Sequence, residues 1–206
     1  MTTEIASIVT AFLTGVAGPV LIIIVRNYLD KRKKPLDMVR EAVEVGNMIS
    51  TKIEHIKHEF DADRVWVSQF HNGGHFYPTG KSIAKFSIFY ETVDGGVSSI
   101  QSNFQNIPVN LFSKSVNELL ENDVIQIADI DNDLTDTFGL KYIAEDTGCK
   151  SAYLFAIKTI DDKFIGTLGI DFTKTKVKLD IESINHLSNH ATAIGGVLMT
   201  HLNKTK

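Results

Sequence analysis

Cysteine is nearly absent from this sequence. Cys149 is the only one among 206 residues, so the chain can form no intramolecular disulfide bond. This usage suits a reducing compartment, and the position of Cys149 directly before an apolar segment predicts a small buried residue.

A strong excess of charge is also lacking. The 21 Lys and Arg residues nearly balance the 25 Asp and Glu residues, and the formal net charge is −4. This balance gives no electrostatic reason to bind nucleic acid, and we expect no nucleic-acid partner. The sequence has no internal repeat and no motif of a P-loop or of an H-E-x-x-H metalloprotease. We therefore expect a binding module rather than an enzyme, and the cofactor is unknown from sequence.

Long apolar runs are absent except for one near the N-terminus. Ile5 to Val25 comprises 21 residues without an ionisable side chain. At ~1.5 Å per helical residue this run spans roughly 30 Å, the thickness of the hydrocarbon core of a bilayer. Pro19 removes one backbone donor, which predicts a kink at Gly18-Pro19. The run is typical of a transmembrane helix, and we expect the lipid bilayer as a partner.

The flanks of this run are asymmetric. Glu4 precedes it, whereas Arg26 and the basic residues 31–34 follow it. The positive-inside rule then places the N-terminus outside and the main domain in the cytoplasm. A secretory signal peptide would carry its basic residues before the apolar region. We expect a single-pass protein of the cell membrane, with an anchor and basic cytoplasmic flank at 1–34 and a soluble domain at 35–206.

The sequence of the soluble part predicts an α+β domain. We expect a central antiparallel sheet of about five or six strands, with long N- and C-terminal helices on one face and an irregular segment over the other. The expected helices cover Pro35 to Phe60, Val109 to Glu121, Leu140 to Thr147 and Leu179 to Leu202. The expected strands cover Arg64 to Phe70, Lys85 to Val93, Ser98 to Phe104, Val124 to Ile130, Ser151 to Ile160 and Phe164 to Phe172.

The first long helix carries one apolar stripe. Its members recur every three or four residues: Met38, Ala42, Val45, Ile49, Ile53, Ile56 and Phe60. The stripe suits a helix that covers the sheet of its own subunit, or one that pairs with the same helix of a second copy. Both arrangements can apply, because a membrane anchor aligns neighbouring chains, so a homodimer stays one of the two interpretations.

This order of elements resembles the GAF fold, a sensory relative of PAS domains. The resemblance is carried by a helix leading into RVWVSQF, by the long excursion from Ser98 to Gly148, and by the terminal hairpin. In that hairpin, Gly166-Thr167-Leu168-Gly169-Ile170 fits the G-x-L-x-[ILV] pattern of GAF domains. The resemblance implies a ligand pocket between the sheet and the excursion, and dimerisation through the first and last helices.

Three chemistries known in GAF proteins do not transfer to these residues. Free methionine sulfoxide reductases of this fold need several cysteines, and bilin-attaching members often have histidine after their cysteine, where this chain has Lys150. The N-K-x-x-F-x-x-x-D-E signature of cyclic-nucleotide binders is also missing. The resemblance therefore implies a possible small-molecule ligand without naming it.

The candidate ligand-binding residues are Phe70, His71, Asn72, Tyr90 and Glu91. They lie where the first strand meets a Gly-rich turn and where the second strand ends. They could therefore line the entrance of the pocket together. Two alternatives stay open: His71 and Asn72 could instead brace the long loop that follows, and Glu91 could pair with a lysine.

Other polar clusters favour structural roles. His71 and His75 lack a third metal ligand nearby, and we expect no metal site. The acidic run from Asp129 to Asp136 lacks the glycine and glutamate positions of a calcium loop, and the i, i+4 pair His186 and His190 is expected on the surface.

Two functions follow from these observations. The first is a membrane-tethered GAF-like sensory or ligand-binding module for signalling, which acts through a partner or through dimerisation. The alternative is an interaction protein that recruits or oligomerises at the membrane without a ligand.

Overall fold

The computed structural model describes residues 2–32, 37–76, 78–133 and 140–204. The chain divides into two compact units, Met1–Met38 and Val39–Lys206. Each unit is described by itself.

The N-terminal unit is helical: α1 (Thr2–Phe12), a π-helical turn (Leu13–Ala17) and α2 (Gly18–Arg32). The π-helical turn precedes Gly18-Pro19, where the sequence predicts a kink, and the Gly18 N–H donates to the Leu13 carbonyl. The turn lies directly before Pro19, which has no N–H to donate. The segment Ile5–Tyr28, with a mean hydropathy of 2.5, is long and apolar enough to cross a membrane.

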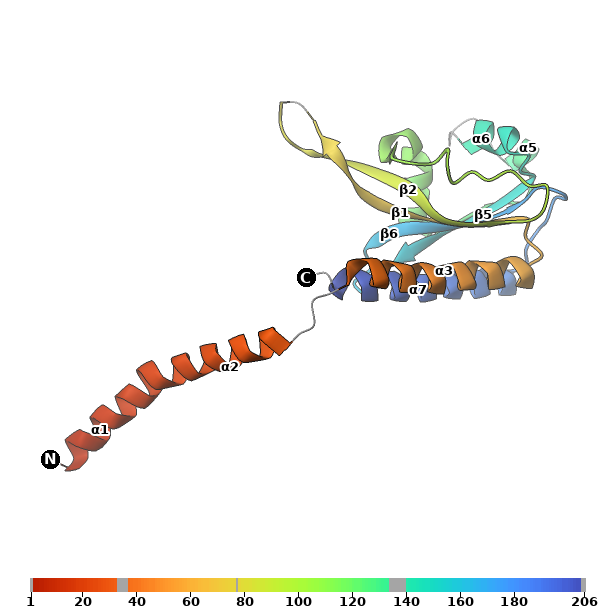
Figure 1. The fold of residues 1–206 in the computed structure, drawn as a ribbon. Coiled ribbons are helices and arrows are strands. Elements are labelled where there is room, and N and C mark those ends of the chain that lie inside the picture. The colour runs from red at the N-terminus through yellow and green to blue at the C-terminus, as the bar shows by residue number, and fades with distance from the viewer. Residues whose placement is uncertain (1, 33–36, 77, 134–139, 205–206) are drawn as a thin grey trace. The chain divides into compact units, whose positions relative to one another are not determined.

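The second unit contains a six-stranded antiparallel sheet, as the sequence predicts (Figure 1). Its strands follow the order β3-β2-β1-β6-β5-β4. They are β1 (Arg64–His75), β2 (Ser82–Val93), β3 (Ile107–Pro108), β4 (Val124–Ile127), β5 (Ser151–Lys158) and β6 (Phe164–Phe172). The hairpins β1-β2 and β5-β6 meet in the centre, where β1 pairs antiparallel with β6.

Two long helices, α3 (Met38–Glu59) and α7 (Ile181–Lys204), lie side by side on one face of this sheet (Figure 1). Their apolar stripes form the main core. The buried members are Val45, Ile49, Ile53 and Ile56 on α3 and Ile184, Leu187, Ala191, Ile194 and Leu198 on α7. The predicted α3 stripe is wrong at Ala42, which is exposed, while Glu41 is buried instead.

The other face is covered by the excursion that the sequence predicts (Figure 1). It comprises the turns of residues 98–106, a 3₁₀ turn (Val109–Phe112), α4 (Ser113–Asn122), α5 (Ile130–Asp133) and α6 (Leu140–Asp146). The expected helix at Val109 starts as a tighter 3₁₀ turn. Its apolar periodicity predicts Leu111 and Leu120 inside, but both are exposed.

Three further expectations for the connecting segments are wrong. Ser98 to Phe104 forms turns instead of a strand, because the Ile100 and Gln101 N–H groups donate to the Glu91 carboxylate and not to a neighbouring strand. The strand expected to reach Ile130 ends at Ile127, and Ile130 opens α5. The sequence also predicts a loop from Asp131 to Gly139, but residues 131–133 belong to α5, and residues 134–139 lie outside the described part of the chain.

The Gly-rich stretch after Phe70 also differs from the expectation of a tight turn. It continues β1, with His71 opposite Lys85 and Asn72 opposite Ala84. The chain reverses only beyond it, where the Phe76 N–H donates to the Lys81 carbonyl. A Cβ at Gly73 would lie 2.1 Å from the Lys85 side chain, so an alanine here would require that flexible side chain to move.

Candidate functional site

The sheet and the excursion enclose a cavity of about 100 Å³. Its sheet side is formed mainly by inward-facing residues of β1, β2, β5 and β6, and its other side by the 98–106 segment and by α4, α5 and α6. The residues that line it are Arg64, Trp66, Ser68, Phe70, Phe86, Ile88, Ile100, Phe104, Phe112, Ser115, Val116, Leu119, Ile127, Ile130, Ile143, Ala144, Thr147, Cys149, Ala152, Leu154, Thr167 and Asp171.

Three phenylalanines form one wall of this cavity. Phe112 lies edge-on to Phe86, with ring centroids 5.5 Å apart, and is tilted against Phe104 at 6.4 Å. Phe86 belongs to the sheet, whereas Phe104 and Phe112 belong to the excursion, so the contact joins the two layers. Such a wall favours flat apolar molecules, because aromatic rings prefer edge-to-face or offset contacts.

A buried ion pair supplies the polar part of the cavity lining. Arg64 Nε donates to Asp171 Oδ2 at 2.7 Å, and the side chains are 1 % and 8 % exposed. Trp66 Nε1 donates to the same carboxylate oxygen at 3.2 Å. Burial raises the pKa of Asp171, and the Arg64 guanidinium and the Trp66 N–H oppose that rise by stabilising the carboxylate.

The Arg64 guanidinium also reaches the covering layer. Its Nη1 donates to the Ser98 carbonyl at 2.9 Å, and its Nη2 donates to Thr147 Oγ1 at 3.3 Å. Arg64 therefore fastens both ends of the excursion to β1 and β6. A ligand that used this guanidinium would have to compete with these partners.

Cys149 lines the cavity as a protonated thiol. Its Sγ donates to the Ser151 carbonyl at 3.1 Å, and the side chain is buried, as the sequence predicts. Burial, with Asp171 nearby, raises the pKa of the thiol far above its usual range. Because the thiolate is the nucleophilic form, this cysteine is held in an unreactive state.

The five residues predicted to bind a ligand do not share one cavity. Phe70 lines it, and its ring lies edge-on to Phe164 at 4.8 Å. Tyr90 instead packs against the core under α3 and α7, on the opposite face of the sheet. The cause is a β-bulge: Val67 pairs with Tyr90 but Ser68 pairs with Ile88, so the extra residue Phe89 turns Tyr90 to the other face.

Glu91 and His71 fasten the segment that covers the cavity. The Glu91 carboxylate accepts the Ile100 N–H at 2.8 Å and the Gln101 N–H at 3.2 Å. Among the described residues it forms no ion pair with Lys81 or Lys85, the alternative left open by the sequence. His71 Nε2 lies 2.9 Å from Ser87 Oγ, which also accepts the Asn106 N–H at 2.8 Å. These contacts hold the 98–106 segment, whereas the sequence alternative named the loop that follows Asn72.

The remaining polar candidates lie away from the cavity. Asn72 is exposed on the extended hairpin. Asp129 and Asp131, which begin the acidic run, both pair with Lys176, at 2.6 and 2.9 Å. The Lys176 ammonium therefore provides the counter-charge for both carboxylates.

Sequence reasoning missed Arg64, Trp66 and Asp171, which form the polar part of the lining. A signal was present, because Arg64 and Asp171 are charged residues at the ends of otherwise apolar strands. A charge in such a strand needs a buried partner. Their pairing across 107 residues was not visible from spacing.

Comparisons with known proteins bear on the fold. No family model matches this sequence, and no curated protein matches it. Solved structures of photoreceptor domains do match. The phycoerythrobilin-bound GAF domain from a cyanobacterial phytochrome is 16 % identical, with a TM-score of 0.63 over 82 % of this chain and 92 % of that one.

Two other structures give the same result. The blue-light absorbing form of the Thermosynechococcus elongatus PixJ GAF domain has a TM-score of 0.62 at 17 % identity, covering 80 % of this chain and 92 % of its own. A far-red cyanobacteriochrome photoreceptor has a TM-score of 0.61 at 12 % identity, covering 92 % and 98 %. At such low identity the likeness concerns architecture alone, and it confirms the fold expected from sequence. The chain has a GAF-like fold.

Proposed function

We propose that this protein is a membrane-tethered GAF-like sensory module that binds a small apolar or aromatic molecule and is not an enzyme. The observation that carries the proposal is the cavity between the sheet and the excursion, with its phenylalanine wall and its buried Arg64–Asp171 pair. Ligand pockets are typically apolar with a few fixed polar groups, and this lining has that composition.

The size of the cavity limits the ligand. Its volume of about 100 Å³ is below the ~300–1,000 Å³ of sites for drug-sized ligands, and nearer the ~150 Å³ of an apolar cavity that accepts benzene. A single aromatic ring is therefore the best match. A larger ligand would first have to displace Ile100 and Phe104 in the covering segment.

A covalently attached bilin fits this chain poorly, although matched structures are described as bound to phycoerythrobilin or biliverdin. The cavity is too small for a tetrapyrrole, and Cys149 is a buried thiol with a raised pKa. We propose non-covalent binding of a smaller molecule.

The sheet offers a route from ligand to output. Along β1, Trp66 and Ser68 line the cavity, while Val65 and Val67 pack in the core beneath α3 and α7. A ligand that shifts β1 therefore also acts on the packing of α3. We propose that this change is passed on through dimerisation or a partner protein.

Ligand binding is tested on the full-length protein in detergent micelles by thermal shift and calorimetry, with benzene, indole and biliverdin as probes. We expect benzene or indole to raise Tm saturably, and biliverdin to form no covalent adduct. Ala152→Leu fills the cavity and should abolish the shift. Ala156→Leu is the matched control, because Ala156 lies on the same strand but does not line the cavity.

Failure of every probe, with Ala152→Leu more stable than the parent protein, would contradict the ligand-binding proposal. Retained binding in Ala152→Leu would place the ligand elsewhere. A covalent biliverdin adduct on Cys149 would overturn the non-covalent assignment.

Membrane attachment through Ile5–Tyr28 is proposed from its length and hydropathy, and the orientation from the basic residues that follow. Cysteine labelling in intact cells with a membrane-impermeant maleimide tests both. Thr3→Cys should react from outside, whereas Lys163→Cys, in the exposed β5-β6 turn, should react only after permeabilisation. Labelling of Lys163→Cys in intact cells would reverse the orientation.

A second candidate function is oligomerisation at the membrane without a ligand. The first turns of α3 favour it, because Val39 is 75 % exposed and Val43 is 56 % exposed one turn further along. Oxidative crosslinking of Val43→Cys in membranes should then yield a dimer. Met48→Cys, half-exposed on another side of α3, is the control, and equal crosslinking of both would contradict a specific α3 pair.

A further inference from the structure

A second polar cluster lies on the face of the sheet away from the cavity. His55 and Glu59 are one turn apart at the end of α3, and His186 and His190 are one turn apart on α7. The sequence predicts the α7 pair on the surface, and His186 is indeed 52 % exposed, whereas the His190 side chain is only 18 % exposed. The two pairs face each other across the two helices.

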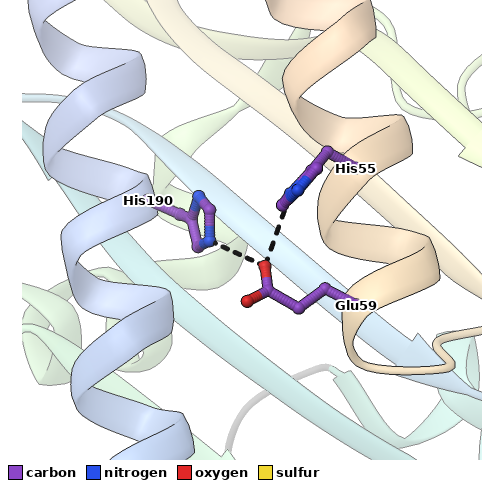
Figure 2. Close-up of side chains that lie close together, drawn as sticks. All are labelled: His55, Glu59 and His190. Carbon is purple, nitrogen blue, oxygen red and sulfur yellow. Dashed lines mark hydrogen bonds and ion pairs between the residues drawn. The ribbon is translucent and has the colours of Figure 1, made fainter.

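The side chains converge on the Glu59 carboxylate. Its Oε2 lies 3.4 Å from His55 Nδ1 and 3.1 Å from His190 Nε2, and its Oε1 lies 3.3 Å from His186 Nδ1. Figure 2 shows His55, Glu59 and His190 pointing toward one another from the two helices. A ligand atom from each of these three residues lies within 4.8 Å of the other two.

The two distances from Glu59 Oε2, 3.4 Å to His55 Nδ1 and 3.1 Å to His190 Nε2, match those between neighbouring ligands of a tetrahedral metal site. Metal–ligand bonds of about 2.0–2.1 Å at tetrahedral angles place neighbouring ligand atoms roughly 3.3–3.4 Å apart. Two imidazoles and one carboxylate are a known ligand set for zinc with one open position. Imidazole nitrogen also suits Zn²⁺ better than Mg²⁺ or Ca²⁺, which prefer oxygen.

We propose that His55, Glu59 and His190 bind one Zn²⁺ ion between α3 and α7, with water or His186 in the fourth position. The ion would join the first and last helices of the domain at a point separate from the ligand cavity. This inference goes beyond the proposed function and does not depend on it.

The surroundings suit a metal better than a purely ionic network. The His186 and His190 rings are stacked, with centroids 4.8 Å apart at 24°, so two positive charges there would repel.

The imidazole rings of the cluster are held in place by a neighbouring ring, and the cluster is accessible from solvent. Phe60 lies edge-on to both His186 and His190, with ring centroids 5.9 and 6.4 Å away, which holds the imidazole planes. A polar depression lined by Glu59, Asp180, Ser183 and His186 opens beside the cluster. Zn²⁺ can therefore reach the site from solvent without any rearrangement of the core.

The test is titration of ZnCl₂ into the full-length protein in detergent, freed of any oligohistidine tag and of bound metal. Calorimetry should show one saturable Zn²⁺ per chain, and Zn²⁺ should raise Tm. Glu59→Gln and His55→Ala should each weaken binding by about tenfold or more, the scale on which supporting residues of metal sites act. His58→Ala is the matched control, because His58 is exposed on the same helix but contacts Glu54.

Co²⁺ supplies a second measurement that does not depend on stability. Four-coordinate Co²⁺ in this site should give intense visible absorption that Glu59→Gln abolishes and His58→Ala retains. Absence of saturable Zn²⁺ binding, or equal affinity in the parent protein and His55→Ala, would overturn the proposal. One Zn²⁺ per two chains would assign the ion to an interface between copies and would equally overturn the site within one chain.

Discussion

Arg64 and Asp171 face each other across neighbouring strands as a buried ion pair, with Arg64 Nε 2.7 Å from Asp171 Oδ2. The pair joins β1 to β6, and the guanidinium extends from there to Ser98 and Thr147 in the covering excursion. One arginine thus connects the sheet to both ends of the segment that closes the cavity.

Removing one member of this pair should be strongly destabilising. Asp171→Asn leaves the Arg64 guanidinium buried without a counter-charge, and losses of this kind amount to about 3–5 kcal/mol. Urea unfolding followed by circular dichroism measures the loss. Glu44→Gln, which breaks the exposed Arg40–Glu44 pair, is the control and should leave unfolding unchanged. Equal midpoints for the two variants would show that the buried pair is dispensable.

Acid should destabilise the protein in part through Asp63. Burial alone raises the pKa of this carboxyl, but the Lys174 side chain and the N–H groups of Lys174 and Thr173 outweigh burial and hold the pKa below its usual range. The stabilisation is therefore present above the unfolded-state value of about 3.9 and is lost as pH falls through the lower folded-state value. Asp63→Asn should be less stable than the parent protein at pH 7, and the difference should shrink below about pH 4. Unfolding free energies measured from pH 7 to pH 2 test this, and a constant difference over that range would contradict it.

Replacing Gly166 or Gly169 of the β5-β6 hairpin with alanine should destabilise the protein. A Cβ at Gly166 would lie 2.0 Å from the Ser68 carbonyl oxygen, and one at Gly169 would lie 2.0 Å from the Trp66 ring. Overpacking typically costs about 1–3 kcal/mol, and Gly166→Ala should cost more than Gly169→Ala because backbone moves less readily than a side chain. Gly196→Ala, in open space on α7, should instead stabilise the protein by roughly 0.5–1 kcal/mol. Thermal unfolding ranks the three variants, and the opposite order for the two hairpin glycines would contradict the argument.

Two tyrosine hydroxyls should differ in their contribution to stability. Tyr153 Oη donates to the Val177 carbonyl at 2.8 Å and accepts the Leu179 N–H at 3.0 Å, and the residue is 1 % exposed. Tyr153→Phe leaves these backbone groups without that partner and should cost about 1–3 kcal/mol. The hydroxyl of half-buried Tyr90 has no hydrogen bond within the described residues, so Tyr90→Phe should change stability by less than about 0.5 kcal/mol.

Tyr90→Phe also bears on the ligand site. Tyr90 lies on the helix side of the sheet, so its substitution should leave any benzene or indole affinity unchanged. A large loss of affinity would show that the ligand binds on that side and not in the cavity.

The sequence alone predicted most of the architecture, although it missed β3 and placed a strand at Ser98 to Phe104. The apolar stripe of α7 and most of that of α3 recur with helical periodicity. The β5-β6 hairpin is marked by two largely apolar runs separated by the polar turn Asp161-Asp162-Lys163. These patterns concern residues that are close in the sequence and that face one apolar core. They can therefore be recognised without knowledge of the fold. The length and hydropathy of the N-terminal run are likewise a property of the chain itself.

The candidate sites were decided by the tertiary structure. A single extra residue in β2, Phe89, moved Tyr90 to the opposite face, and no alternation pattern records such a bulge. Arg64 meets Asp171 across 107 residues, and Glu59 meets His190 across 131. Sequence periodicity specifies which face of an element is apolar. Strand register and helix packing, which depend on contacts across the whole chain, decide which polar side chains meet.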